Sequence, residues 1–103
     1  MNCELPMHER IAAIRELSIP ECIWQERVKE DAKWGEQNHD DFGWLSILSE
    51  EVGEAAQCLN KSYLDPVERA EAMEWRGLLE IELIQIAATA VAWLECIRRR
   101  ENP

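Results

Sequence analysis

Residues 78–94 read LLEIELIQIAATAVAWL and are apolar on almost every side of a helix. A helix with this pattern is buried all round rather than along one face. The other helices of a 103-residue chain can hardly surround it alone. The stretch therefore predicts an all-α bundle in which a second apolar face of this helix meets another subunit. That face consists of Ile81, Ile84, Ala88 and Val91.

Apolar residues at helical spacing predict three further helices before this one, within a single domain that covers residues 1–103. They are expected at about 5–17, at about 20–34 and at about 42–62, with a loop rich in turn formers at 35–43. The last helix is expected to begin at Asp65-Pro66, a capping residue followed by a first-turn proline. It runs to about Arg99, as one helix or as two abutting helices that break at Gly77.

The composition excludes several classes of partner. Twenty-one acidic residues against eleven basic ones give a net charge of −10, which would repel nucleic acid. The four cysteines are widely spaced and include no Cys-x-x-Cys pair, which is typical of buried thiols rather than of a zinc or redox site. The first residues lack the pattern of a secretory signal, and no apolar run approaches the roughly 20 residues of a membrane span. We therefore expect a cytoplasmic protein without a membrane partner.

Acidic residues on two of the expected helices form a candidate metal site. Glu51 and Glu54 are three residues apart, so they project about 60° apart around the helix axis, whereas Glu50 points further from the apolar stripe. An isolated Glu-x-x-Glu is usually a charged helix flank. Glu82 changes this interpretation, because an ionised carboxylate in apolar surroundings must be paired, protonated or bound to metal. Two helices thus offer oxygen ligands to one interior, which suits Mg²⁺.

The motif Glu51-x-x-Glu54, followed after a spacer by Glu82-x-x-Gln85, resembles the signature of the MazG-like all-α nucleoside triphosphate pyrophosphohydrolases. The resemblance covers about residues 33–94. It implies a four-helix core completed by dimerisation, and hydrolysis of a (deoxy)nucleoside triphosphate to the monophosphate and pyrophosphate. It also implies Mg²⁺ or Mn²⁺ as the cofactor.

The resemblance assigns roles to the acidic residues. Glu51, Glu54 and Glu82 would hold the ion, which neutralises and orients the triphosphate and activates a water for attack. Glu50 is a candidate base that positions this water, and its direction away from the apolar stripe fits a surface role equally well. Gln85 departs from the family pattern, which has aspartate there. Its neutral amide oxygen is a weaker ligand, so we expect weaker metal binding and weaker activity.

The resemblance also implies substrate contacts from the loop that follows Lys33. Trp34 is suited to stacking on a base, while Lys33 and His39 are suited to polar edges or phosphate. The alternative interpretation is that Trp34 and Trp44 are packing anchors.

Phosphate contacts are less well defined by the sequence. The chain stops at Pro103, before the basic and amide-rich segment that many relatives add. We therefore expect Lys61, or residues 98–100 of a neighbouring subunit, to contact the phosphates.

Two other functions compete with this one. A non-catalytic helical module that binds a nucleotide or another protein through its apolar faces would need no metal. A ferritin-like di-iron bundle needs paired Glu-x-x-His motifs, and only Glu36-x-x-His39 fits, in a loop. The sequence leaves open the base, the sugar, the number of metal ions, and whether the homo-oligomer is a dimer or a tetramer.

Overall fold

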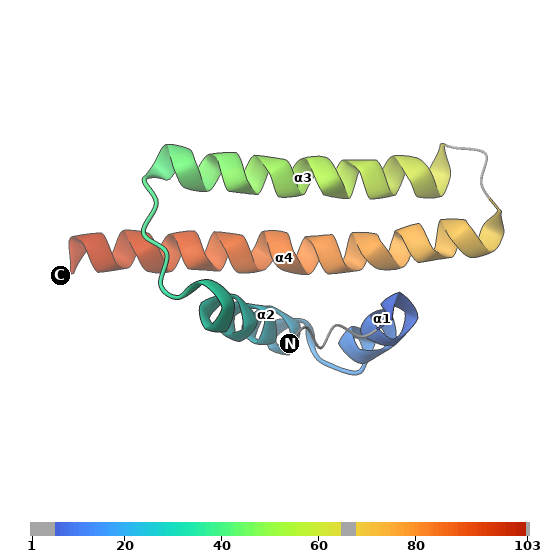
Figure 1. Cartoon of the computed structure of the whole chain (residues 1–103), viewed down its shortest axis with the longest axis horizontal. Helices are drawn as coiled ribbons and strands as arrows, with labels where there is room; N and C mark the ends of the chain where they lie inside the picture. Colours follow the sequence, from blue (N-terminus) through green and yellow to red (C-terminus); the bar gives the residue numbers. More distant parts are fainter. Residues whose placement is uncertain (1–5, 65–67, 103) are drawn as a thin grey trace.

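The computed structural model describes residues 6–64 and 68–102. These residues form four helices and no strand, which confirms the all-α prediction. The helices are α1 (Met7–Arg15), α2 (Ile19–Trp34), α3 (Asp41–Tyr63) and α4 (Arg69–Glu101). Figure 1 shows α3 and α4 running antiparallel side by side, with α1 and α2 along another side of α4. Each of the first three helices packs against α4, which is therefore the centre of the fold.

Side-chain caps determine where α2 and α3 begin. Ser18 Oγ accepts a hydrogen bond from the Glu21 amide at 3.2 Å, and Asp40 Oδ1 accepts one from the Gly43 amide at 2.7 Å. Gly35, with a φ of 71°, ends α2 in a backbone conformation that favours glycine. The segment between Gly35 and Asp40 is thus an extended loop that leads from α2 to α3, as predicted.

The helix α4 is continuous from Arg69 to Glu101, so of the two alternatives the single helix is confirmed and no break occurs at Gly77. Gly77 is instead a contact point, because a Cβ atom there would overlap Ile11 Cδ1 and lie 2.8 Å from Ile11 Cγ1. The missing side chain allows α1 to pack closely against α4. The expected helix start at Asp65-Pro66 lies outside the described residues.

The prediction that Ile81, Ile84, Ala88 and Val91 form a subunit contact is wrong for the centre of that face. Ile81 is only 6% exposed and Ala88 is 0% exposed within the single chain. Packing of α1 and α2 against α4 covers this side of the helix. Apolar residues that are about half exposed lie elsewhere on the hairpin, and we call them the apolar face. They are Leu45, Val52 and Leu59 on α3, and Leu83 and Leu94 on α4.

The buried core near the loop contains Trp44, Ala92 and Cys96, with Ile47 and Trp93 packed against it. This cluster joins the start of α3 to the end of α4. In the described part of the chain all three cysteines are buried and free, as predicted from their spacing.

The hydropathy of α4 is higher than the sequence analysis allowed. It contains an 18-residue window with a mean hydropathy of 1.5, so its length and composition would suffice to cross a membrane. The core helix of a soluble protein meets the same criterion. The cytoplasmic location and the absence of a membrane partner stay predictions.

Candidate functional site

The three glutamates expected to bind metal come together between α3 and α4. The pKa of Glu82 is raised to about 7, first by burial, then by a hydrogen bond to Glu54 and by the charges of Glu54 and Glu51. Glu82 Oε2 is buried and makes no hydrogen bond with another described residue. A buried, unpaired carboxylate oxygen is costly. Crowding of like charges around it is the feature that a divalent cation would relieve.

Glu51, on α3, forms a hydrogen bond with a residue of α4. Thr89, which is 3% exposed, donates a hydrogen bond from Oγ1 to Glu51 Oε1 at 2.5 Å. Burial raises the pKa of Glu51, the Thr89 hydrogen bond opposes that rise, and the charges of Glu54 and Glu26 add to it. Glu51 thus belongs to the same electrostatic cluster as Glu82.

Two further carboxylates reach this cluster from α2, and the sequence analysis did not identify them. Burial and then the charge of Glu26 raise the pKa of Glu30, and the charge of Glu51 contributes as well. Glu26 and Glu30 are four residues apart, so they share one face of α2. Their spacing is visible in the sequence. Only the packing of α2 reveals that this face is turned towards Glu51.

The two other predicted site residues are less directly placed. Glu50, the candidate base, is exposed. Gln85 is half-buried and makes no hydrogen bond with another described residue. Within residues 6–64 and 68–102, no three His, Cys, Asp or Glu side chains already form a metal-binding group. The carboxylates would therefore have to draw closer together around an ion, although the buried, unpaired oxygen of Glu82 fits that role.

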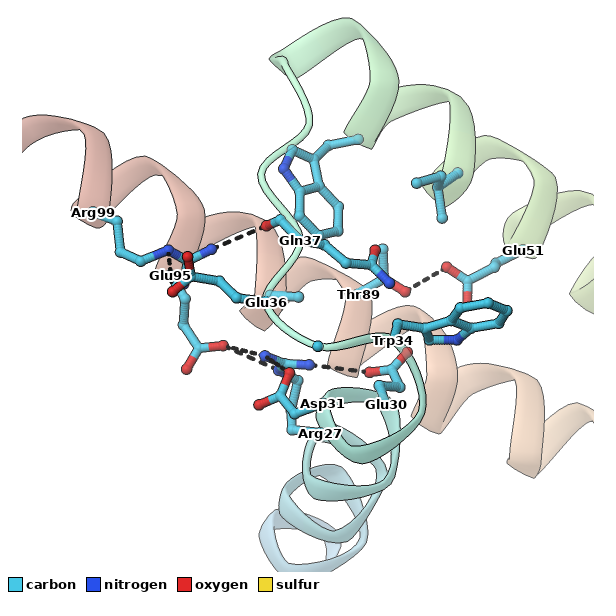
Figure 2. A pocket seen from close by; sticks show the side chains of 14 residues that line it. Arg27, Glu30, Asp31, Trp34, Glu36, Gln37, Glu51, Thr89, Glu95 and Arg99 are labelled. Atoms are coloured by element: carbon cyan, nitrogen blue, oxygen red, sulfur yellow. Dashed lines mark hydrogen bonds and ion pairs between the residues drawn. The ribbon is translucent and has the colours of Figure 1, made fainter. Parts of the chain in front are cut away.

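A cavity of about 460 Å³ opens beside Glu51, and Figure 2 shows it from close by. Trp34 lies at its edge from the end of α2, with its side chain largely exposed, whereas Trp44 is 3% exposed and belongs to the core. The packing interpretation therefore holds for Trp44 alone. The apolar part of the wall also contains Ile47 and Ala92.

Two arginines line the cavity, and both are held by acidic or loop partners. Arg27, which is 8% exposed, donates from Nη2 to Glu95 Oε1 at 2.6 Å and lies 3.0 Å from Asp31 Oδ1. Arg99 donates from Nη2 to the Gln37 carbonyl at 3.0 Å, so it ties α4 to the loop of its own chain. Figure 2 shows these contacts on the side of the cavity away from Glu51.

The acids in the cavity wall outnumber the arginines. The acidic lining residues are Glu30, Asp31, Glu36, Glu51 and Glu95. A triphosphate would be repelled by such a wall unless a cation offset the charge.

The other predicted substrate residues differ in position. The Lys33 ammonium lies 4.9 Å from the centre of the Trp34 ring, at the cavity edge. His39 packs edge-on against Trp44 with ring centres 4.9 Å apart, and it does not line the cavity. Lys61 follows Glu51 by ten residues, which is about 15 Å along α3. Arg99, which the sequence analysis assigned to a neighbouring subunit, lines the cavity within its own chain.

Chemically, the arrangement combines an acidic cluster suited to a hard cation with an aromatic surface suited to a planar ring. Glu51 belongs to both parts, because it lines the cavity and interacts with Glu54 and Glu82. Comparisons of the chain with protein-family models, with curated proteins and with solved structures find no match. Any function must therefore be argued from the residues themselves.

Proposed function

We propose that this chain is a Mg²⁺-dependent nucleoside triphosphate pyrophosphohydrolase, as its resemblance to the MazG-like family implies. The observation that carries the proposal is the position of Glu51. It lies in the carboxylate cluster with Glu82 and also in the wall of the cavity that Trp34 borders. A nucleotide with its base at Trp34 would therefore direct its phosphates towards the carboxylates.

In the proposed reaction, Glu51, Glu54 and Glu82 would hold the ion. Mg²⁺ bound there would offset the charge of the triphosphate and lower the cost of water attack. Trp34 stacks on the base and limits its movement. Glu50, on the exposed side of α3, is the proposed base that positions the attacking water. Addition of water across the α–β anhydride bond yields the monophosphate and pyrophosphate.

The test is a screen for pyrophosphate release over the common ribo- and deoxyribonucleoside triphosphates, with Mg²⁺, with Mn²⁺ and with neither. We expect metal-dependent release from at least one nucleotide, and little release from a Glu82→Gln variant. Release of free phosphate alone would indicate a different cleavage. No pyrophosphate from any nucleotide at any metal concentration would refute the proposal and favour the non-catalytic interaction module.

We also propose a homo-oligomer, at least a dimer, joined through the apolar face on α3 and α4. Leu45, Val52 and Leu59 are seven residues apart, so they form one stripe. Helical spacing places Val52 about 140° around α3 from the cavity-lining Ile47. Likewise, Leu83 lies about 180° around α4 from the cavity-lining Ala92. Both stripes are thus turned away from the cavity.

Exposed apolar surface of this extent is an aggregation liability unless a partner covers it. A second copy would present the same two helices and complete a four-helix core. Light scattering at micromolar concentration should give at least twice the monomer mass. Val52→Glu should reduce that mass to the monomer, whereas Gln57→Glu, which adds the same charge to α3 outside the stripe, should not. A monomeric parent protein would refute the dimer.

A further inference from the structure

Thr89 carries a buried hydroxyl beside the carboxylate cluster, and this hydroxyl donates its hydrogen bond to another helix. A threonine in a helix commonly donates its hydroxyl proton to a carbonyl one turn earlier. Thr89 instead donates across the helix interface, from Oγ1 on α4 to Glu51 Oε1 on α3. A hydroxyl has one proton, so this donor is committed to Glu51.

The contact leaves the two oxygens of Glu51 in different states. Oε1 accepts the hydrogen bond from Thr89, whereas Oε2 makes no hydrogen bond or ion pair with another described residue. Oε2 of Glu51 is therefore the oxygen that is available to a ligand. Both residues line the cavity, and Figure 2 shows their side chains meeting there, with their hydrogen bond drawn.

We infer that Thr89 is a positioning residue, which orients Glu51 for cation binding and which the sequence motif does not include. This inference rests on the proposed metal site. Groups that hydrogen-bond to metal ligands typically change metal affinity by about 10- to 100-fold when they are removed. A purely structural role predicts something else: the buried hydroxyl would merely satisfy its own hydrogen-bonding capacity, and its loss would lower stability while metal affinity stayed the same.

The experiment compares Mg²⁺ binding by calorimetry in three variants and in the unsubstituted protein. Thr89→Val keeps the shape of the side chain and removes the donor, whereas Thr89→Ser keeps the donor. Ser62→Ala is the control, because it removes a different buried hydroxyl, which donates to the Leu59 carbonyl. We expect the Kd for Mg²⁺ to rise about 10- to 100-fold in Thr89→Val. It should stay within about threefold of the unsubstituted protein in Thr89→Ser and in Ser62→Ala.

Each result decides between the roles. Equal Mg²⁺ affinity in Thr89→Val and in the unsubstituted protein would overturn the positioning role while leaving the metal site intact. No Mg²⁺ binding by the unsubstituted protein would refute the metal site and the role of Thr89 with it. If circular dichroism shows that the valine variant is unfolded, Thr89→Ala provides a second donor-free variant. The same rise in Kd is expected for it, and an unchanged Kd would again overturn the inference.

Discussion

Replacement of Glu82 by glutamine is the most informative perturbation, because it tests whether Glu82 is a crowded carboxylate or an ordinary surface acid. In the metal-free protein the pKa of Glu82 is raised from 4.5 to about 7. Below pH 4.5 the side chain is protonated in both the folded and the unfolded chain, so it costs nothing. Between pH 4.5 and pH 7 only the folded chain keeps the proton. Stability therefore falls as the pH rises through this range.

The magnitude follows from the size of the shift. One pKa unit corresponds to 1.36 kcal/mol, and the Glu82 side chain is partly screened by solvent, so the loss should be about 1–2 kcal/mol. Glu82→Gln cannot ionise and therefore escapes this loss. At pH 8 and without metal, the variant should be more stable than the parent by about the same amount. For a chain of this size the melting temperature should rise by about 5–10 °C.

The assay is thermal unfolding at fixed protein concentration, from pH 4.5 to pH 8, with a chelator and then with saturating Mg²⁺. Glu74→Gln is the matched control, since Glu74 is an exposed glutamate of α4 and makes no ion pair with another described residue. It should change the free energy of unfolding by less than about 0.5 kcal/mol. Mg²⁺ should stabilise the parent and leave Glu82→Gln nearly unchanged. If the metal-free variant is less stable than the parent at pH 8, the account of the cluster is wrong.

Three further predictions test other parts of the molecule. Trp34→Ala should raise the KM for the nucleotide without changing Mg²⁺ affinity, because it removes stacking worth about 1–3 kcal/mol. An unchanged KM in steady-state kinetics would contradict the contact between Trp34 and the base. Gly77→Ala should lower the melting temperature, because its Cβ would overlap Ile11, whereas Gly53→Ala, with open space around it, should raise the free energy of unfolding by up to about 1 kcal/mol. Gln85→Asp should lower the melting temperature of the metal-free protein, and added Mg²⁺ should restore it. A lower melting temperature that Mg²⁺ does not restore would place Gln85 outside the site.

The helices could be predicted from the sequence because their signals are local. The Ser18 and Asp40 caps, Pro20 in the first turn of α2, and the spacing of apolar residues each act over a few positions. Glu82 stood out for a similar reason. A carboxylate within an apolar stretch must be compensated whatever packs against it, so its environment is predictable before its partners are known.

What only the tertiary structure decided is which side of each helix meets which neighbour. The amphipathic pattern of α2 does not show that Glu26 and Glu30 face Glu51, or that Arg27 is buried beside Glu95.

The same holds for α4, where nearly all sides are apolar and the pattern therefore does not rank them. Packing of α1 and α2 covers Ile81 and Ala88, turns Gly77 into a contact point, and leaves Leu83 and Leu94 exposed. Helical periodicity determines which residues share a face. The choice between faces depends on burial summed over contacts that are distant in the chain, and this sum exists only once the helices have packed together.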